Sequence, residues 1–175
     1  AGGSCRDLIL NNGATITTGA NTLSIDGVVN YIGSGRVLGK VTRNNLSGTG
    51  INYLLSANNY LNITSAGITS VTIQEFPNTA PPNPGPSYDA NKAVNRYYTI
   101  SDVTGAGSAI VRLDYLAGEM GSGFTSADGN VWEYTASGPW INQGQLTAAN
   151  YYAEPASPIS AANLVGDYAI ATSDA

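Results

Sequence analysis

The chain has 175 residues, which is enough for one domain with its own core or for a domain with a small appendage. Only 11% of the residues are charged, whereas Gly, Asn, Ser, Thr and Tyr are abundant, and this composition is typical of secreted all-β proteins with many tight turns. Seven Lys and Arg stand against twelve Asp and Glu, for a net charge of −5. We therefore expect no basic stripe for phosphates and no nucleic-acid partner.

The ends and the apolar runs of the chain bear on its compartment. No apolar run approaches the ~20 residues that a spanning helix needs, so we expect no membrane span. The chain begins with small residues and without an initiator Met, as a mature protein does after removal of a signal peptide, so we expect a secreted, extracellular or cell-surface protein. Cys5 is the single cysteine, and three interpretations stay open: a buried thiol, an intermolecular bond or a relic of a lipid-attachment site.

Residues 1–30 alternate short apolar pairs with turns. Asn12-Gly13 and Asp26-Gly27 accept positive φ at little cost and are strong signals for a hairpin or a solenoid corner. The pattern predicts N-terminal strands that form either a small meander or a short β-helical ladder. The apolar positions between the turns are Leu8, Leu10, Ile16, Leu23, Ile25 and Val28.

Residues 31–175 are expected to form an antiparallel β-sandwich, which makes the whole chain all-β. Turn signals recur every ~8–12 residues, as a sandwich requires. Residues 77–86 contain five prolines and predict an extended crossover outside the sheets, because proline lacks the main-chain donor of a sheet ladder. The first strands predicted in this part are residues 37–42, 50–56, 60–64 and 70–76.

The stretch 91–100 predicts a central strand. Val94, Arg96, Tyr98 and Ile100 alternate with smaller or more polar residues at a period of two, so the strand has two different faces. Arg96 is a cation in an otherwise apolar or neutral run, and such a charge is tolerated only beside a carboxylate or several carbonyls. We interpret Arg96 as a structural pin between two sheets or at a strand edge, with a ligand-binding arginine as the alternative.

Two segments resemble a known family. Residues 92–100, KAVNRYYTI, resemble the K-x-V-N-R-Y-W-T-I strand of secreted β-rich surface and adhesin-type modules of the Bacteroidota and related bacteria. Residues 34–43, SGRVLGKVTR, resemble the S-G-x-V-x-G-K-x-x-R segment that precedes it in the same proteins. The resemblance implies a β-rich fold and an extracellular location, and it says little about activity because such modules occur in proteins of many kinds.

The second half contributes three further predictions. Residues 109–116 predict a strand in which Arg112 and Asp114 lie on one side, placed to pair with each other or across strands as further structural pins. Residues 124–125 and 131–134 flank Asp128-Gly129-Asn130 and predict a hairpin, and residues 118–123 predict a flexible turn. Residues 167–172, with Tyr168 and Ile170, predict the closing strand.

Catalytic signatures are scarce. Without His and with one Cys, the familiar catalytic triads and zinc sites are excluded, so we expect no enzyme and no cofactor. A pair of glycosidase carboxylates remains open only formally, because no spacing singles one out among Asp114, Glu119, Glu133 and Glu154. Asp-Gly loops are better explained as turns than as calcium sites, so no metal is expected.

Two function classes remain. The first is a structural subunit of an extracellular bacterial filament, pilus or sheath, a homopolymer held by β-strand addition between subunits. Low charge favours it, because copies repel one another little. The second is a monomeric adhesin or carbohydrate-binding module, with Trp132 and Trp140 stacking on surface glycans. For the first class, the predicted subunit interface consists of Arg6, Leu8, Leu10, Tyr168 and Ile170, with residues 6–10 as the donated strand.

Overall fold

The computed structural model describes residues 2–56, 58–82, 88–135, 138–149 and 151–174. Strands dominate these residues, so the predicted all-β class is confirmed. None of the described helices has the length and apolar character needed to cross a membrane. The strands are β1 (Gly3–Cys5), β2 (Leu8–Leu10), β3 (Thr15–Ile25), β4 (Val29–Tyr31), β5 (Arg36–Arg43), β6 (Asn52–Leu54), β7 (Tyr60–Ser65), β8 (Ile68–Pro77), β9 (Ala93–Gly105), β10 (Ser108–Asp114), β11 (Asn130–Tyr134), β12 (Ile141–Asn142), β13 (Thr147–Ala149), β14 (Tyr152–Glu154), β15 (Ile159–Ser160) and β16 (Gly166–Ala171), with 3₁₀ helices η1 (Ala90–Lys92), η2 (Ala117–Glu119) and η3 (Ser126–Asp128).

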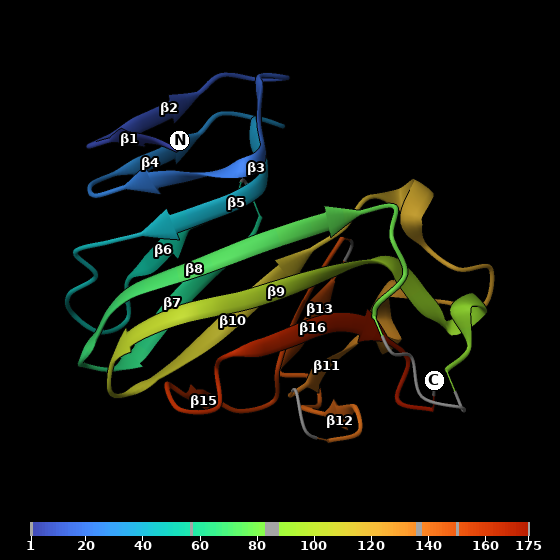
Figure 1. Ribbon diagram of the computed structural model, residues 1–175. Helices are drawn as coiled ribbons and strands as arrows, with labels where there is room; N and C mark the ends of the chain where they lie inside the picture. The colour runs from blue at the N-terminus through green and yellow to red at the C-terminus, as the bar shows by residue number, and fades with distance from the viewer. Residues whose placement is uncertain (1, 57, 83–87, 136–137, 150, 175) are drawn as a thin grey trace.

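The strands form two facing layers. One layer is an eight-stranded sheet in the order β1-β3-β5-β8-β9-β16-β11-β12. The other is a sheet in the order β13-β14-β10-β7-β6, with β15 also paired to β10, and the small β2-β4 sheet continues this layer beside β6 (Figure 1). The Tyr31 hydroxyl of β4 donates to the Leu55 carbonyl beyond β6 at 2.6 Å, which ties the small sheet to the sandwich.

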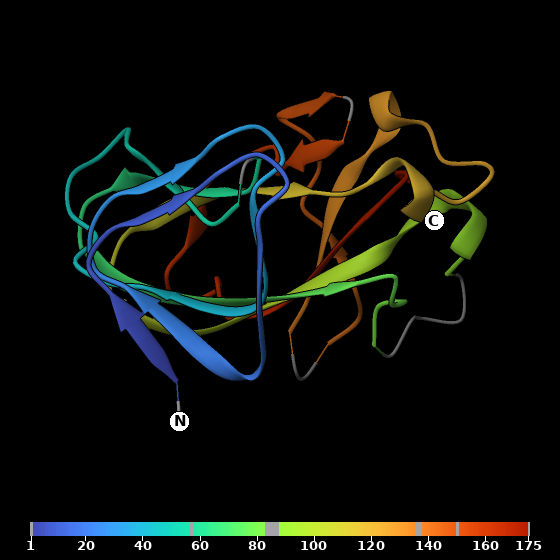
Figure 2. The same cartoon turned by 90° about the horizontal axis from the view of Figure 1, so that it is seen from above.

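The N-terminal strands form a short β-helix. β1 and β3, β3 and β5, and β2 and β4 all pair in parallel. Leu8 pairs with Val29 and Thr15 with Arg36, so one turn of the coil takes about 21 residues. Figure 2 looks down onto this N-terminal coil, which we define as β1 to β5. The β-helical alternative is therefore confirmed, and a meander is excluded because its neighbours would run antiparallel.

The predicted division of the chain after residue 30 does not mark a break in the structure. β4 spans that position, and β5 belongs both to the coil, through β3, and to the sandwich, through its antiparallel pairing with β8. One sheet thus runs from the coil into the sandwich. The sandwich is antiparallel, as predicted, and only the coil is parallel.

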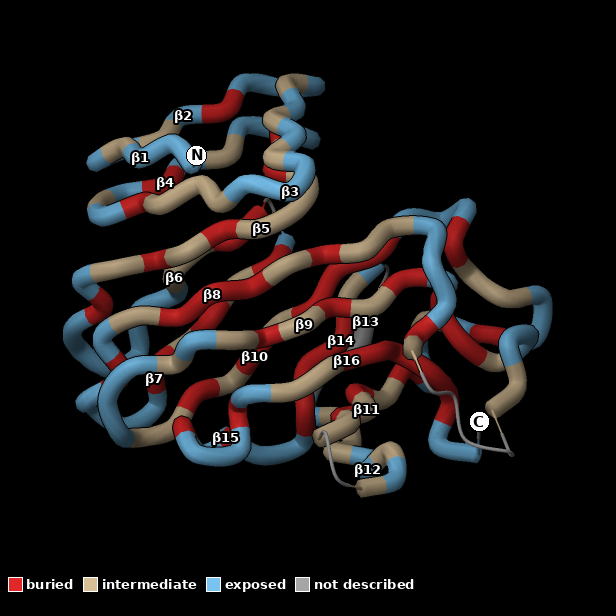
Figure 3. Tube along the Cα trace, viewed as in Figure 1, coloured by how far each residue is buried: buried red, intermediate tan, exposed pale blue. Residues whose placement is uncertain are grey.

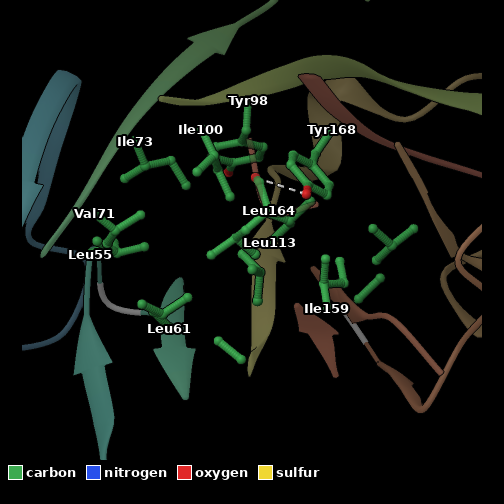
Figure 4. Packing of buried hydrophobic residues seen from close by; sticks show 14 of the residues in the cluster. Leu55, Leu61, Val71, Ile73, Tyr98, Ile100, Leu113, Ile159, Leu164 and Tyr168 are labelled. Carbon is green, nitrogen blue, oxygen red and sulfur yellow. Dashed lines mark hydrogen bonds between the residues drawn. The ribbon is translucent and has the colours of Figure 1, made fainter. Parts of the chain in front are cut away.

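The main core lies between the two layers. Tyr98, Ile100 and Tyr168 of the eight-stranded sheet face Leu61 and Leu113 of the opposite sheet (Figure 4). A second, smaller cluster fills the coil and contains Leu10, Ile25, Val29, Val37 and Val41. Figure 3 shows buried residues concentrated along β9 and β16, with exposed residues more frequent in the coil. β9 is the predicted central strand, and Val94, Arg96, Tyr98 and Ile100 are its buried face.

Three local predictions are corrected. Residues 124–128 form no strand of a hairpin, because the Thr125 hydroxyl bonds Asp128 and closes η3, and β11 pairs instead with β16 and β12. The first part of the segment predicted as flexible, 118–123, overlaps η2, which buries Glu119, whereas the turn predicted at its end is present at Ser122 and Gly123. Pro77 ends β8 inside the sheet. It is tolerated there because β5 pairs with β8 only as far as Gln74, so no donor is needed on that side. Residues 83–86 of the predicted crossover lie outside the described residues.

Candidate functional site

The outer turn of the N-terminal coil presents two free strand edges. β1 ends the eight-stranded sheet, and β2 ends the small sheet, so among the described residues neither strand has a neighbour on its outer side. We call β1 and β2, with the connecting Arg6 and Asp7, the outer turn. Figure 2 shows it nearest to the viewer when the coil is seen from above. Free edges of this kind are templates for pairing with another strand.

The direction of the main-chain groups on β2 follows from its bonds to β4. Leu8 N donates to Val28 O at 2.9 Å, and Leu10 O accepts from Ile32 N at 2.8 Å. Because peptide groups alternate in direction along a strand, the N–H and C=O of Ile9 point to the free side. On β1, Cys5 O accepts from Asp26 N at 3.2 Å, so the main-chain groups of Cys5 point to β3. The N–H and C=O of the preceding residue, Ser4, therefore point to the free side.

Polar corners hold the turns of the coil in register. Asn12 Oδ1 accepts from both the N–H and the hydroxyl of Ser34, each at 3.0 Å. Asp7 Oδ1 accepts from Val28 N at 2.8 Å. A Cβ on Gly33 would collide with Asn12 Oδ1, and a Cβ on Gly27 would collide with Asp7 Oδ1. Each corner thus packs a polar side chain against a glycine in the next turn of the coil. The outer turn is therefore a well-defined edge.

The predicted donor strand, residues 6–10, is already part of the coil. Leu10 is buried and Leu8 packs against the same coil core, so neither is free to enter a pocket of another copy. Residues 6–10 are therefore not a free strand that could be donated, because β4 pairs with Leu8–Leu10. Arg6 does lie on the surface, with a side chain 90% exposed beside Asp7. Cys5 is a half-buried free thiol on β1.

Tyr168 and Ile170 occupy the centre of the molecule. They lie on β16, which is hydrogen-bonded to β9 on one side and β11 on the other, and both side chains are buried. Their predicted place at a subunit interface is corrected, because no edge of β16 is open. The apolar alternation that predicted a closing strand is equally typical of a strand buried in a sheet.

Exposed apolar side chains accompany the small sheet. Ile9 of β2 is 64% exposed, and Val28 and Ile32, which flank β4, are 61% and 53% exposed. Large aliphatic side chains at these levels of exposure give the coil an apolar exterior next to its free edge. A surface of this kind suits contact with another protein more than contact with water.

Arg96 is the pin that the sequence predicts. Its Nε and Nη2 donate to the two carboxylate oxygens of Glu119 at 2.9 and 3.0 Å, and its Nη1 donates to Glu75 at 3.0 Å. Asp114 lies 3.5 Å from the same Nη1 and 3.4 Å from Arg36. We call these five residues the buried charge cluster. They join β5, β8 and β9 to the end of β10 and to η2.

Glu75 is the unusual member of the cluster. Burial raises its pKa to about 7, against the opposing effects of Arg96 and Arg36. Its Oε1 has no hydrogen-bond partner among the described residues, and neither has Asn59 Oδ1. Both residues line a cavity of about 10 Å³ that also borders Tyr98. Two acceptors beside such a small cavity fit a protonated Glu75 or a single water molecule.

Arg112 pairs across strands, which is one of the two arrangements that the sequence predicts. Its guanidinium lies between the rings of Tyr60 and Tyr152, at 4.4 and 4.0 Å from their centroids, and bonds Glu154 at 2.9 Å. Arg112 and Asp114 therefore do not pair with each other. Arg112 joins β10 to β14 and β7 within one sheet, whereas Asp114, at the end of β10, belongs to the charge cluster that connects the two layers.

The two tryptophans lie on neighbouring segments. Trp132 of β11 is half-buried, and its Nε1 donates to Thr172 O at 3.1 Å. Trp140 packs against Tyr134 of the same strand, with ring centroids 5.5 Å apart. We call Trp132, Tyr134 and Trp140, which lie on or beside β11, the aromatic group at β11, and both tryptophans are half-buried.

Several charged residues of the structure escaped the sequence prediction. Arg36 and Glu75 complete the charge cluster, and buried Arg43 donates to Leu54 O and, at 2.7 Å, to Gly27 O. Burial lowers the pKa of Arg43. Glu75 could have been predicted as a buried acid that needs a partner, because it is a lone acid in an apolar strand. The reasoning that identified Arg96 applies to it unchanged.

Neither metal chemistry nor a relative adds to the site. The part of the chain that the structure describes contains no group of three or more Cys, Asp or Glu that could hold a metal ion. No family model, curated protein or solved structure matches the chain. The outer turn, the charge cluster and the aromatic surfaces must therefore be interpreted from their own geometry.

Proposed function

We propose that the chain is a structural subunit of an extracellular bacterial filament, pilus or sheath, and that copies join by β-strand pairing at the outer turn. The observation that carries this proposal is the pair of free edges on β1 and β2, with the peptide groups of Ile9 and Ser4 directed outward. A strand of a second copy placed against β1 or against β2 would extend the sheet to which that strand belongs, through main-chain hydrogen bonds.

The surface around the outer turn supports contact between copies. Ile9, Val28 and Ile32 expose apolar surface beside the free edge, and burying it would favour association. Few charges oppose close approach, since charged residues make up 11% of the chain. Low charge and turn-rich β structure are also the features that motivate the extracellular location.

The mechanism differs from donation of a free strand. Because β2 is already paired with β4, the outer turn acts as a preformed edge that accepts a neighbour. A filament requires a heterologous contact, in which this edge meets a different edge of the next copy. The eight-stranded sheet ends at β12 on its opposite side, where Ile141 is exposed, and this edge is the counterpart that we propose.

Electron microscopy of negatively stained wild-type and Ile9→Pro protein tests the proposal. Wild-type protein should form regular fibres. Ile9→Pro should remain dispersed, because proline removes the outward N–H while the bonds of Leu8 and Leu10 to β4 stay intact. Ile9→Thr is the matched control, since it shortens the side chain but keeps the donor, and it should still assemble.

Dispersed wild-type particles at high concentration would refute the polymer. Fibres formed by Ile9→Pro would refute the edge of β2 as the contact, because this variant leaves β1 unchanged. Deletion of residues 1–10 is a less selective test, because it removes Leu10 from the coil core together with the edge.

The aromatic group at β11 favours a second candidate, a monomeric adhesin or carbohydrate-binding module. Trp132 and Trp140 keep part of their rings accessible, and flat aromatic faces stack on sugar rings. In that case soluble glycans should quench tryptophan fluorescence, and Trp140→Ala should remove the effect. Unchanged fluorescence across a glycan panel would exclude this aromatic group as the site.

A further inference from the structure

A pocket lies where the coil meets the sandwich. Four segments line it: the corner before β5, the turn between β6 and β7, the end of β10 with the start of η2, and the residue before β14. Its volume is about 360 Å³, within the range of small-ligand sites. Neither the outer turn nor the tryptophans contribute to it. The lining includes Arg36, Ser56, Asn58, Asp114, Tyr115 and Tyr151.

Buried polar groups belong to the lining of this pocket. Ser56 donates to Asp114 Oδ2 at 2.9 Å, and Arg36 Nη2 lies 3.4 Å from Asp114 Oδ1. Arg36 Nε is buried and has no hydrogen-bond partner among the described residues. Its nitrogen is closed off from solvent, so a bound molecule would meet the other polar groups of the lining.

An aromatic residue with an unusual backbone borders the same pocket. Tyr151 has φ +75, a conformation that a bulky side chain adopts only at a cost, and it is 44% exposed. Its ring meets the edge of Tyr115 at a centroid distance of 6.0 Å. Asn58 adds an exposed amide to the lining. The pocket thus combines an accessible aromatic ring with an exposed amide.

The charge next to the pocket selects among ligands. The buried charge cluster contains two guanidinium groups and three carboxylates, so it is negative by one charge when all five are ionised. Whether Glu75 is ionised or protonated, the cluster has no net positive charge with which to attract an anionic ligand. Both guanidinium groups are paired with carboxylates of the cluster. The positive charge of Arg36 is therefore already neutralised inside the protein and does not attract an anionic ligand. These features favour an uncharged ligand that offers oxygens and one apolar face.

We propose that this pocket binds one uncharged sugar unit of a glycan. Such a unit has a C–H face that can stack on Tyr151, and it has hydroxyls that can exchange hydrogen bonds with the exposed amide of Asn58. The inference goes beyond the assembly of copies and does not depend on it. It also places glycan recognition away from Trp132 and Trp140.

Saturation-transfer NMR with glucose, galactose, mannose, xylose and N-acetylglucosamine, one at a time at millimolar concentration, tests the proposal. The signal is observed on the sugar, so the measurement works for monomers and for fibres alike. At least one sugar should give a signal. Tyr151→Gly and Asn58→Ala should each lower the affinity for that sugar about tenfold and weaken the signal accordingly. Glycine suits positive φ, so Tyr151→Gly removes the ring without adding backbone strain.

Trp140→Ala is the control and should leave the signal unchanged. No signal from any of the five sugars would overturn the proposal. A signal lost in Trp140→Ala but kept in Tyr151→Gly would also overturn it, because binding would then belong to the aromatic group at β11. Preferential binding of glucuronate or glucosamine over the neutral sugars would overturn the assignment of an uncharged ligand.

Discussion

Glu75 and Arg96 share a buried site but behave differently as single residues. Arg96 is surrounded by Glu119, Glu75 and Asp114, so its charge is fully compensated. Glu75 has one oxygen bonded to Arg96 and the other without a partner among the described residues. Desolvation therefore dominates at Glu75, and the neutral acid is favoured near neutral pH.

This pKa shift predicts a pH-dependent stability. The pKa of Glu75 is about 7 in the folded chain against an ordinary value of 4.5, so the folded state holds the proton more tightly. The stabilisation is fully present below the unfolded pKa and is lost as pH rises through about 7. The free energy of unfolding should therefore fall by about 2–3 kcal/mol between pH 4.5 and pH 8 from this residue alone.

Glu75→Gln isolates the effect, because glutamine cannot titrate. Urea unfolding of wild type and variant across the pH range measures it. The difference in unfolding free energy between the two proteins should favour wild type more at the acidic end than at the basic end. Parallel stability curves would show that Glu75 does not retain its proton. Arg36, Arg96, Tyr98, Asp114 and Glu119 are the charged or titratable groups that surround it.

At the scale of elements, two arginines hold strands together with unequal strength. Arg96 connects β9 to β8, to η2 and to the end of β10, and its side chain is 1% exposed. Arg112 connects β10 to β14 and β7 near the surface, through Glu154 and two tyrosine rings. Burial decides the difference, since removing one partner of a buried ion pair leaves an uncompensated charge.

Arg96→Met and Arg112→Met form a matched pair of variants. Arg96→Met should lower the free energy of unfolding by about 3–5 kcal/mol, because Glu119 and Glu75 lose their counter-ion in the core. Arg112→Met should cost about 1–2 kcal/mol, since its site is partly solvated and Glu154 keeps its bond with Tyr60. Chemical denaturation measures both, and equal losses would contradict the structural difference between the sites.

The turn-rich elements of the coil show why their pairing was harder to predict. Asn12-Gly13 and Asp26-Gly27 suit a hairpin and a solenoid corner equally well, because both need positive φ or a close backbone approach. In the structure, Asn12 bonds Ser34 and Asp7 bonds Val28, each one turn along the coil. The contacts that distinguish a β-helix from a hairpin thus join residues that are about 21 positions apart in the sequence.

At the scale of the whole molecule, coil and sandwich are one cooperative unit. β5 pairs with β3 of the coil and with β8 of the sandwich, so a single sheet crosses the predicted boundary. Arg43 adds a second connection, from β5 to Gly27 of the coil and to Leu54 of β6. Neither part can open without exposing the edge of the other.

Calorimetry should accordingly show one unfolding transition. Performed in dilute solution, where copies do not associate, it should give equal calorimetric and van't Hoff enthalpies. Asn12→Ala, which weakens only the coil, should shift the single transition to lower temperature. Two transitions, of which Asn12→Ala moves only one, would show that residues 1–30 fold separately from the sandwich.

The amino-acid sequence by itself determined the all-β class, the central strand at β9, the alternation of its faces and the need for carboxylates around Arg96. These are local properties, set by a period of two and by the cost of burying a charge. Only the tertiary structure decided that the N-terminal strands run parallel, that β16 lies inside the sheet, that Glu75 and Glu119 are the partners of Arg96, and that the outer turn is free. Those outcomes depend on which distant segments pair, and residues of the same type can satisfy a sheet centre or a sheet edge equally well.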